Sequence, residues 1–116
     1  MDSLALAHQI VDVIEDKKAE NIVLLDLGAD SPLADFMVVA TGNSDRQLRA
    51  LTDYVRIGVK EHFNKAPFGV DGTPESGWVL LDYGEVIVHL FTRDLRDFYD
   101  IETLWRERAK VMLSIQ

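Results

Sequence analysis

The sequence predicts a single α/β domain with a mixed sheet flanked by helices, and three observations lead to this fold class. The chain has 116 residues, the length of one ordinary domain. Two short apolar runs, residues 21–27 and 34–41, are typical of strands buried on both faces. Two longer segments, residues 3–18 and 43–65, place apolar residues at helical spacing. With a hairpin and helical turns after them, these elements indicate a sheet with helices packed on it.

Residues 3–18 carry one apolar stripe, which is typical of a helix that packs one side against a core. The stripe consists of Leu4, Ala7, Ile10, Val11 and Ile14. Asp2 or Ser3 can cap this helix, because either side chain can accept a hydrogen bond from a free backbone N–H group. Turn-forming residues in 28–32 end the first strand, and Gly42 ends the second.

A second helix is expected to begin at Ser44, which precedes Gln47 in an S-x-x-Q arrangement. In this arrangement the hydroxyl accepts from the backbone N–H of Gln47 while the glutamine side chain reaches back. The buried stripe is expected to consist of Leu48, Leu51, Val55, Val59 and His62 or Phe63. Gly58 is expected to let a strand come close. The opposite face carries Arg46, Arg49, Asp53, Arg56 and Lys60. Because Asp53 interrupts the basic residues, we expect a solvated helix face.

Residues 77–91 are expected to form a β-hairpin, since two apolar strands flank the turn at residues 82–85. Gly84 can take the positive φ that a two-residue hairpin loop needs. Such a loop sets Trp78 against His89. A longer loop would change this register but keep the alternation within each strand.

Period-two alternation gives the hairpin two different faces. One face is entirely aliphatic and is expected to lie on the helices: Val79, Leu81, Val86, Val88 and Leu90. The other face carries rings and aliphatic residues with acids at one end: Trp78, Leu80, Asp82, Glu85, Ile87, His89 and Phe91. Before the hairpin, Phe68 and Val70 are expected in a short edge strand.

The segment after the hairpin is expected to form two short consecutive helices. The first can start at Thr92 or Asp94 and the second at Asp100, because residues suited to a first helical turn follow each of them. Residues 106–116 can extend the second helix or fray, and the sequence leaves their structure open.

The composition excludes several classes of function. Cysteine is absent, which excludes disulfides, iron–sulfur clusters, thiol catalysis and cysteine-based zinc sites. His8, His62 and His89 show no metal-binding spacing, and no cofactor is expected. Twenty acidic and twelve basic residues give a net charge of −8, which repels phosphate backbones and attracts basic partners. Extensive direct binding to nucleic acid is therefore not expected.

The N-terminal segment lacks the features of a targeting sequence. Its second residue is acidic, no basic region precedes the apolar residues, and His8, Gln9 and Asp12 interrupt them. No apolar run approaches the ~20 residues that a membrane span requires. We expect a soluble, cytoplasmic protein with no membrane contact.

An enzymatic function is the alternative hypothesis. The strand–Gly42–Ser44–helix order is similar to the entry of a nucleotidyltransferase site, where backbone amides would hold phosphates. That chemistry also needs carboxylates on neighbouring strands to hold Mg²⁺, and residues 86–91 contain no Asp-x-Asp. A catalytic His89 would need a nucleophile within reach, and no G-x-S-x-G motif supplies one. Helix capping remains the simpler interpretation of Ser44.

The C-terminal third favours a surface for a protein partner. Aromatic and aliphatic residues stand among acids there: Trp78, Tyr83, Phe98, Tyr99, Leu104 and Trp105. Rings with an acidic rim suit a basic protein, because charge speeds encounter while the rings supply affinity. The alternative is that Trp78 and His89 are core residues covered by the C-terminal helices.

Two stretches, ADFMVVATGNSDRQLRALTDYV and GWVLLDYGEVIVHLFTRDLRDFYDIETLW, resemble the Iojap family, the ribosomal silencing factors. The matching positions are Gly42, Ser44, Trp78, Asp82, Tyr83, Gly84, His89, Phe98, Tyr99, Leu104 and Trp105. On this basis residues 1–105 are taken as the silencing-factor domain and residues 106–116 as a C-terminal tail. The resemblance implies a nucleotidyltransferase-like fold without the catalytic carboxylates and without that activity.

The resemblance also implies a function. Such factors bind a basic large-subunit ribosomal protein of the uL14 type, at the face of the 50S-type subunit that meets the small subunit. They thereby block subunit joining when nutrients are short. Carried over to matching positions, the expected contact residues are Trp78, Asp82, Tyr83, Gly84, Glu85, His89, Phe98 and Tyr99. Some members form homodimers, which the sequence leaves open here. For the basic stripe, contact with ribosomal RNA is the less favoured alternative to a solvated helix face.

Overall fold

The computed structural model describes residues 2–105 and 107–116, and within them it shows one α/β domain built on a six-stranded mixed sheet. The elements in chain order are α1 (Ser3–Asp16), β1 (Glu20–Asp26), β2 (Phe36–Gly42), α2 (Asp45–Phe63), β3 (Gly69–Thr73), the short 3-10 helix η1 (Pro74–Ser76), β4 (Trp78–Asp82), β5 (Val86–Thr92), α3 (Arg93–Tyr99), α4 (Ile101–Trp105) and β6 (Lys110–Ile115).

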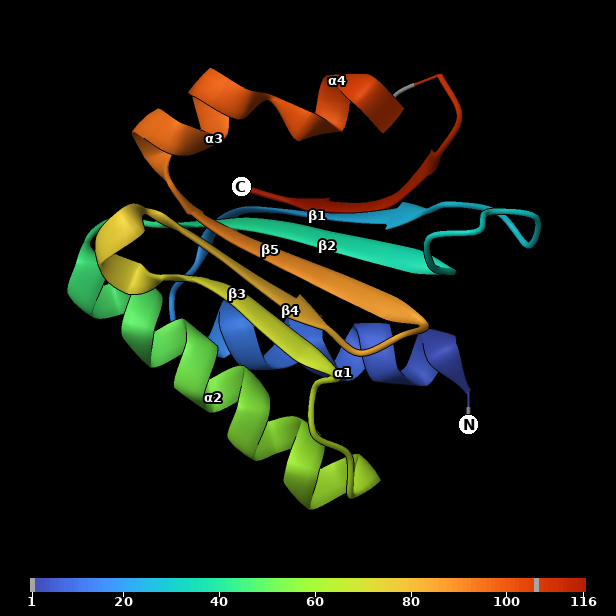
Figure 1. Cartoon of the computed structure of the whole chain (residues 1–116), viewed down its shortest axis with the longest axis horizontal. Helices are drawn as coiled ribbons and strands as arrows, with labels where there is room; N and C mark the ends of the chain where they lie inside the picture. The colour runs from blue at the N-terminus through green and yellow to red at the C-terminus, as the bar shows by residue number, and fades with distance from the viewer. Residues whose placement is uncertain (1, 106) are drawn as a thin grey trace.

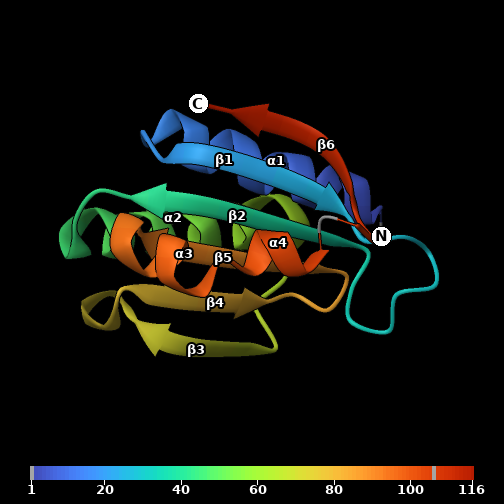
Figure 2. The same ribbon diagram turned by 90° about the horizontal axis from the view of Figure 1, so that it is seen from above.

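The sheet has the strand order β3-β4-β5-β2-β1-β6. β2 and β5 pair in parallel at the centre, and the other neighbours pair antiparallel. α1 and α2 cover one face, while α3 and α4 lie on the other (Figure 1). Figure 2 shows α3 and α4 above the middle of the sheet, with β3 and β6 at its two edges. The predicted fold class, a mixed sheet flanked by helices, is confirmed.

Among the described residues, no helix combines the length and the apolar character that crossing a membrane would require.

The two long helices begin at the predicted caps. The Asp2 carboxylate accepts from the backbone N–H of Leu4 at 3.0 Å, and the Ser44 hydroxyl accepts from that of Gln47 at 3.0 Å. The side chain of Gln47 does reach back, but its oxygen accepts from the N–H of Asn43 at 2.6 Å. The predicted stripe of α2 is buried from Leu48 to Val59, but at its end His62 is exposed and Phe63 is only partly buried. The stripe of α1 is buried except at its first residue.

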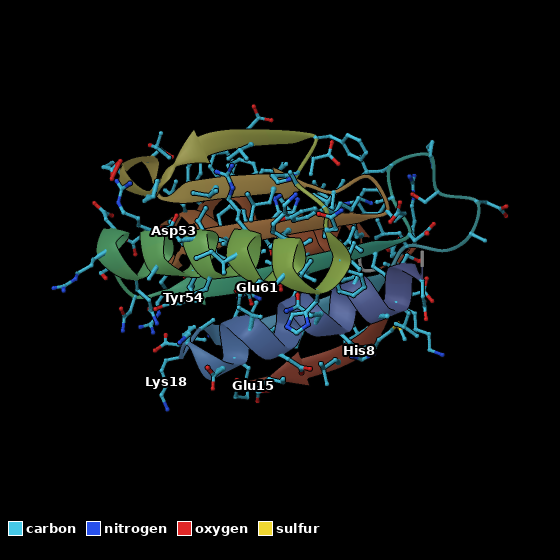
Figure 3. The ribbon with its side chains drawn as sticks, turned by 90° about the horizontal axis from the view of Figure 1, so that it is seen from below. His8, Glu15, Lys18, Asp53, Tyr54 and Glu61 are labelled. Carbon is cyan, nitrogen blue, oxygen red and sulfur yellow. The ribbon has the colours of Figure 1, made fainter. Side chains whose placement is uncertain are left out.

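Gly58 lets a helix, and not a strand, come close. A Cβ atom at this position would lie 2.8 Å from Nε2 of Gln9 and 3.1 Å from Cγ2 of Val13. Both of these residues belong to α1, which runs beside α2 beneath the sheet (Figure 3). The expectation of a neighbouring strand is therefore wrong, because helical periodicity alone does not say which element packs on a small residue.

The hairpin register differs from the expected one. Trp78 lies opposite Phe91 rather than His89. The reason is the turn: Gly84 has a φ of 84°, as predicted, but Tyr83 is not among the residues with positive φ. A type I′ loop centred on Tyr83 and Gly84 needs positive φ at both positions, so the turn lies one residue further along the chain. The N–H of Tyr83 donates to the carbonyl of Val86 at 2.9 Å, which leaves Gly84 and Glu85 at the tip. The Asp82 carboxylate stabilises the turn by accepting from the N–H of Gly84 at 2.8 Å.

The register shift is by an even number of residues, so the predicted faces are retained. Val86, Val88 and Leu90 belong to the apolar cluster between the sheet and α1 and α2. Ile87 and Phe91 belong to a second cluster on the other face, which Leu95, Ile101 and Trp105 help to cover. β5 is therefore buried on both sides and forms the centre of the core.

The sequence did not predict the last strand, β6, because it left the structure of residues 106–116 undecided. β6 pairs antiparallel with β1, with Leu113 opposite Leu24. Leu113 and Ile115 pack against the core on the α1 side, whereas Val111 and Met112 are exposed. Short alternation is a weak signal at the end of a chain, and the strand exists because β1 offers it an edge.

Replacing Gly72 with alanine should lower the free energy of unfolding by about 2 kcal/mol or more. Gly72 has a φ of +79°, and a Cβ atom would lie 2.0 Å from the carbonyl oxygen of Trp78. Denaturant titration of Gly72→Ala measures the loss. Gly69→Ala is the control in the same strand, because nothing lies within 4 Å of its Cβ position. We expect the control to stay within about 0.5 kcal/mol of the parent. Equal losses in the two variants would contradict the steric argument.

Candidate functional site

Aromatic rings gather where the hairpin meets α3. Trp78 lies at the centre, with ring centroids 4.9 Å from Phe91, 4.7 Å from Tyr99 and 5.8 Å from His89. These separations are in the range in which offset and tilted aromatic pairs attract each other. The rings come from β4, β5 and α3, and Trp78 links the buried Phe91 to the half-exposed Tyr99. The cluster is therefore continuous from the core to the surface.

His89 supports this cluster from beneath as a neutral side chain. Its Nδ1 accepts a hydrogen bond of 3.1 Å from Nε1–H of Trp78, so Nδ1 carries no proton. The side chain is 7% exposed, and burial lowers the pKa of His89 from 6.5 to about 4. This placement agrees with the alternative interpretation, in which His89 is a core residue covered by the C-terminal helices.

The outer side of α3 and α4 is apolar and exposed. Phe98 is 77% exposed, Tyr99 47% and Leu104 73%. The Phe98 and Tyr99 rings meet edge to face at 5.0 Å, which holds both rings in place. Exposed acidic side chains lie close to them in the sequence, at Asp94, Asp97 and Asp100. We call Trp78, Phe98, Tyr99 and Leu104 the aromatic surface.

Arg96 fastens the two short helices to the sheet. Its guanidinium makes paired hydrogen bonds to the Glu102 carboxylate, at 2.8 and 3.0 Å, which join α3 to α4. Nη1 also donates to the Thr41 hydroxyl at 2.8 Å and to the backbone carbonyl of Asn21, which join α3 to β2 and β1. The Arg96 side chain is only 10% exposed. Helices of seven and five residues are too short to persist alone, so this contact helps to position the aromatic surface.

The predicted contact residues in the hairpin turn form a second group. Asp82 closes the turn, and the ring of Phe68 lies so close to Gly84 that a Cβ there would be 2.9 Å from it. The Glu85 carboxylate accepts from Nζ of Lys65 at 3.1 Å. The length of β4, about 13 Å, separates this group from Trp78. The structure thus brings Trp78, His89, Phe98 and Tyr99 together but places the turn group apart from them.

Tyr83 points into the core. It is 0% exposed, it belongs to the cluster on the α1 and α2 side, and burial raises its pKa to about 12. Its hydroxyl has no hydrogen-bond partner among the described residues. A buried ring cannot reach a partner, so we correct the expected contact set by removing the Tyr83 side chain. The strand pattern gave no sign of this, because Tyr83 lies in the turn.

Two surface residues that the contact set omits also belong to this region. Phe68 is 76% exposed beside Gly84, although the sequence suggested only an edge strand there. Asp71 is exposed on β3 directly opposite Leu80. Alternation along β3 could have placed Asp71 on the ring-bearing face, but only after the β3–β4 register was known.

The crevice that would serve a nucleotide-binding enzyme lies at the ends of the parallel strands. It is lined by Gly42, Asn43, Thr92, Arg93 and Asp94. Asp94 is the one carboxylate in this lining. Within residues 2–105 and 107–116, no three or more His, Cys, Asp or Glu side chains are grouped so as to hold a metal ion.

These features describe a small α/β protein that presents exposed rings with an acidic rim, as proteins that act by binding a partner do. The family model described as "Ribosomal silencing factor during starvation" matches residues 1–116. The chain belongs to this family of ribosomal silencing factors, RsfS, whose members are regulators rather than enzymes.

Individual relatives agree with this assignment. The chain is 34% identical to a ribosomal silencing factor of Halalkalibacterium halodurans, over 98% of this chain and 97% of the relative. It is 31% identical to the chloroplastic protein Iojap of Arabidopsis thaliana, over 99% of this chain and 48% of the relative. A crystal structure of a Chromobacterium violaceum protein matches with a TM-score of 0.84 and 37% identity, covering 90% of this chain and 87% of that one. The resemblance to the Iojap family is thus confirmed.

Replacing Arg96 with methionine should lower the free energy of unfolding by about 2–3 kcal/mol. The substitution leaves Glu102, which is 22% exposed, without its charged partner and frees α3 from Thr41. Denaturant titration measures the loss. Arg93→Met is the control on the same helix, since it removes an ion pair to Glu20 in which the Arg93 side chain is 69% exposed. The control should cost no more than about 0.5 kcal/mol. An equal cost for both would show that Arg96 does not fasten the helices.

His89 should make the protein less stable in acid. Because its pKa is about 4 in the folded chain and 6.5 in the unfolded chain, the unfolded chain binds a proton first as the pH falls. The folded chain therefore has its full stability above pH 6.5, and about 3 kcal/mol is lost as the pH falls from 6.5 to 4. His89→Gln retains an acceptor for Trp78 but does not titrate. The stability difference between parent and variant, measured by denaturant titration across this range, should change by that amount. Parallel curves would disprove the role of burial.

Proposed function

We propose that this protein represses translation by binding the large ribosomal subunit through the aromatic surface. The observation that carries the proposal is the exposure of Phe98 and Leu104, at 77% and 73%, on helices that Arg96 fastens to the sheet. Exposed rings on a firm support lose little conformational freedom on binding, so they are suited to act as anchors. Membership of the family described as ribosomal silencing factors during starvation supports the ribosome as the target.

The proposed partner is a basic large-subunit ribosomal protein of the uL14 type. The net charge of −8 favours a basic partner at long range, and the exposed Asp94, Asp97 and Asp100 favour it close to the rings. Protein-to-protein contact at the rings would supply most of the affinity, while the acids would increase the rate of encounter.

The proposed mechanism is obstruction. A domain of this size, bound at the face of the 50S-type subunit that meets the small subunit, occupies space that the small subunit needs. No covalent bond is made or broken in such a mechanism, and it requires no proton transfer by the residues of the aromatic surface. In this proposal the protein acts in the cytoplasm under nutrient limitation, with a nucleotidyltransferase-like fold that serves only as a scaffold.

The alternative, a nucleotide-binding enzyme, has one observation in its favour. The crevice beside Gly42 and Thr92 lies at the carboxyl ends of two parallel strands, where α/β proteins often bind ligands. Calorimetry with a nucleotide and Mg²⁺ distinguishes the two functions, because binding that depends on Mg²⁺ would favour the enzyme.

Two further partners remain predictions. Contact with ribosomal RNA would use the basic stripe on α2, which lies on the opposite side of the sheet from the aromatic surface (Figure 1). Arg49 of this stripe already pairs with Glu75, which weakens its attraction for phosphate. A homodimer could use the aromatic surface on itself and would then compete with the ribosome.

Replacing Phe98 with alanine should weaken binding to isolated large subunits by about 2 kcal/mol, or roughly 30-fold. The truncation removes an exposed ring, so the fold should be unaffected. Co-sedimentation with large subunits measures the affinity, and subsequent addition of small subunits measures the block of joining. Tyr54→Ala is the control, because Tyr54 is 42% exposed on α2 at the opposite face (Figure 3). Full blocking activity in the Phe98 variant would count against the aromatic surface.

A further inference from the structure

A groove lies beside the aromatic surface, between β4 and α3. Its volume is about 270 Å³, and Trp78, Leu80, Leu95 and Tyr99 form apolar walls. Figure 2 shows how α3 crosses above the sheet next to β4, with β3 along the outer edge. Because Trp78 and Tyr99 line the groove and also belong to the aromatic surface, the groove lies on the side of the domain that carries the rings.

One carboxylate stands at this groove. Asp71 lies opposite Leu80 in the β3–β4 pair, so the two side chains point to the same face of the sheet, toward the groove. Asp71 is exposed and forms no ion pair with any residue in the described part of the chain. The groove therefore combines aromatic walls with a negative charge that no basic side chain of the described residues neutralises.

The walls are held in place without a ligand. Trp78 is oriented by its hydrogen bond to His89 and by contact with the rings of Phe91 and Tyr99. Gly72, also in the groove lining, is followed by a capping box in which Thr73 and Ser76 bond each other's backbone N–H groups. A groove that is already formed loses little free energy to ordering when it is filled.

The size and the chemistry of the groove limit which group can fill it. Ligand pockets for small molecules usually measure about 300–1,000 Å³, so this groove is small for a cofactor and suits one long side chain. An aliphatic stem fits apolar walls, a cationic end is attracted to the faces of tryptophan and tyrosine, and a carboxylate can accept its hydrogen bonds. Lysine and arginine are the side chains with all of these features.

We propose that the groove receives a lysine or arginine side chain of the basic protein that the aromatic surface binds. The stem lies between Leu80 and the Trp78 and Tyr99 rings, and the charged end meets Asp71. This inference rests on the proposed function and adds to it a site that determines which partner is bound. The exposed rings hold the partner, and the groove selects partners with a cation at the matching position, because another side chain would leave Asp71 unpaired.

The test compares variants in co-sedimentation with isolated large subunits at low and moderate salt. Asp71→Asn removes the charge with little change of shape and should weaken binding about 10-fold, with a smaller dependence on salt than the parent shows. Leu80→Trp fills the groove and should weaken binding to a similar extent. Glu61→Gln is the control, because it removes one acid on α2 at the opposite face (Figure 3) and should leave the affinity unchanged. Circular dichroism and thermal unfolding identify variants that fail to fold.

The outcomes separate the two proposals. Weaker binding of Asp71→Asn to large subunits, with the affinity of Glu61→Gln unchanged, supports the groove proposal. Equal weakening by both variants overturns it, because net charge alone would then explain the loss. Unchanged binding by Asp71→Asn together with weak binding by Phe98→Ala also overturns the groove but leaves the proposed function standing. Failure of the parent protein to bind large subunits would contradict both the groove proposal and the proposed function.

Discussion

The buried guanidinium of Arg96 is the contact on which the exposed surface of this protein depends. It joins α3 to α4 through Glu102 and joins both helices to the sheet through Thr41 and the carbonyl of Asn21. Two helices of seven and five residues have too few internal hydrogen bonds to stay folded alone. Their packing on the sheet, fastened by one arginine, turns a flexible C-terminal segment into a support for rings.

The two faces of the sheet are covered in different ways, and this difference separates stability from binding. On one face α1 and α2 bury a continuous aliphatic cluster that also encloses Tyr83. On the other face the cover is small, and apolar residues remain exposed beyond it at Phe98 and Leu104. A protein that must present apolar side chains to a partner needs a second face of this kind, because a fully covered sheet would leave nothing to bind.

His89 and Trp78 show how one residue pair can belong to the core and also support the proposed site. His89 is buried and neutral, and its hydrogen bond sets the orientation of Trp78. Trp78 in turn contacts Tyr99 at the surface and lines the groove near Asp71. The choice between core residue and contact residue is therefore too simple here, since core packing is what positions the proposed contact.

The sequence by itself determined the two long helices with their caps, the strands before residue 92 and the two faces of the hairpin, because periodicity and capping depend on residues a few positions apart. It also indicated the ring-bearing, acidic C-terminal third and the family. Only the tertiary structure decided that Tyr83 points inward, that Trp78 lies opposite Phe91, and that β6 completes the sheet. These outcomes, like the placement of Asp71 beside the groove, depend on which distant segments pack together, and the local pattern does not contain that information.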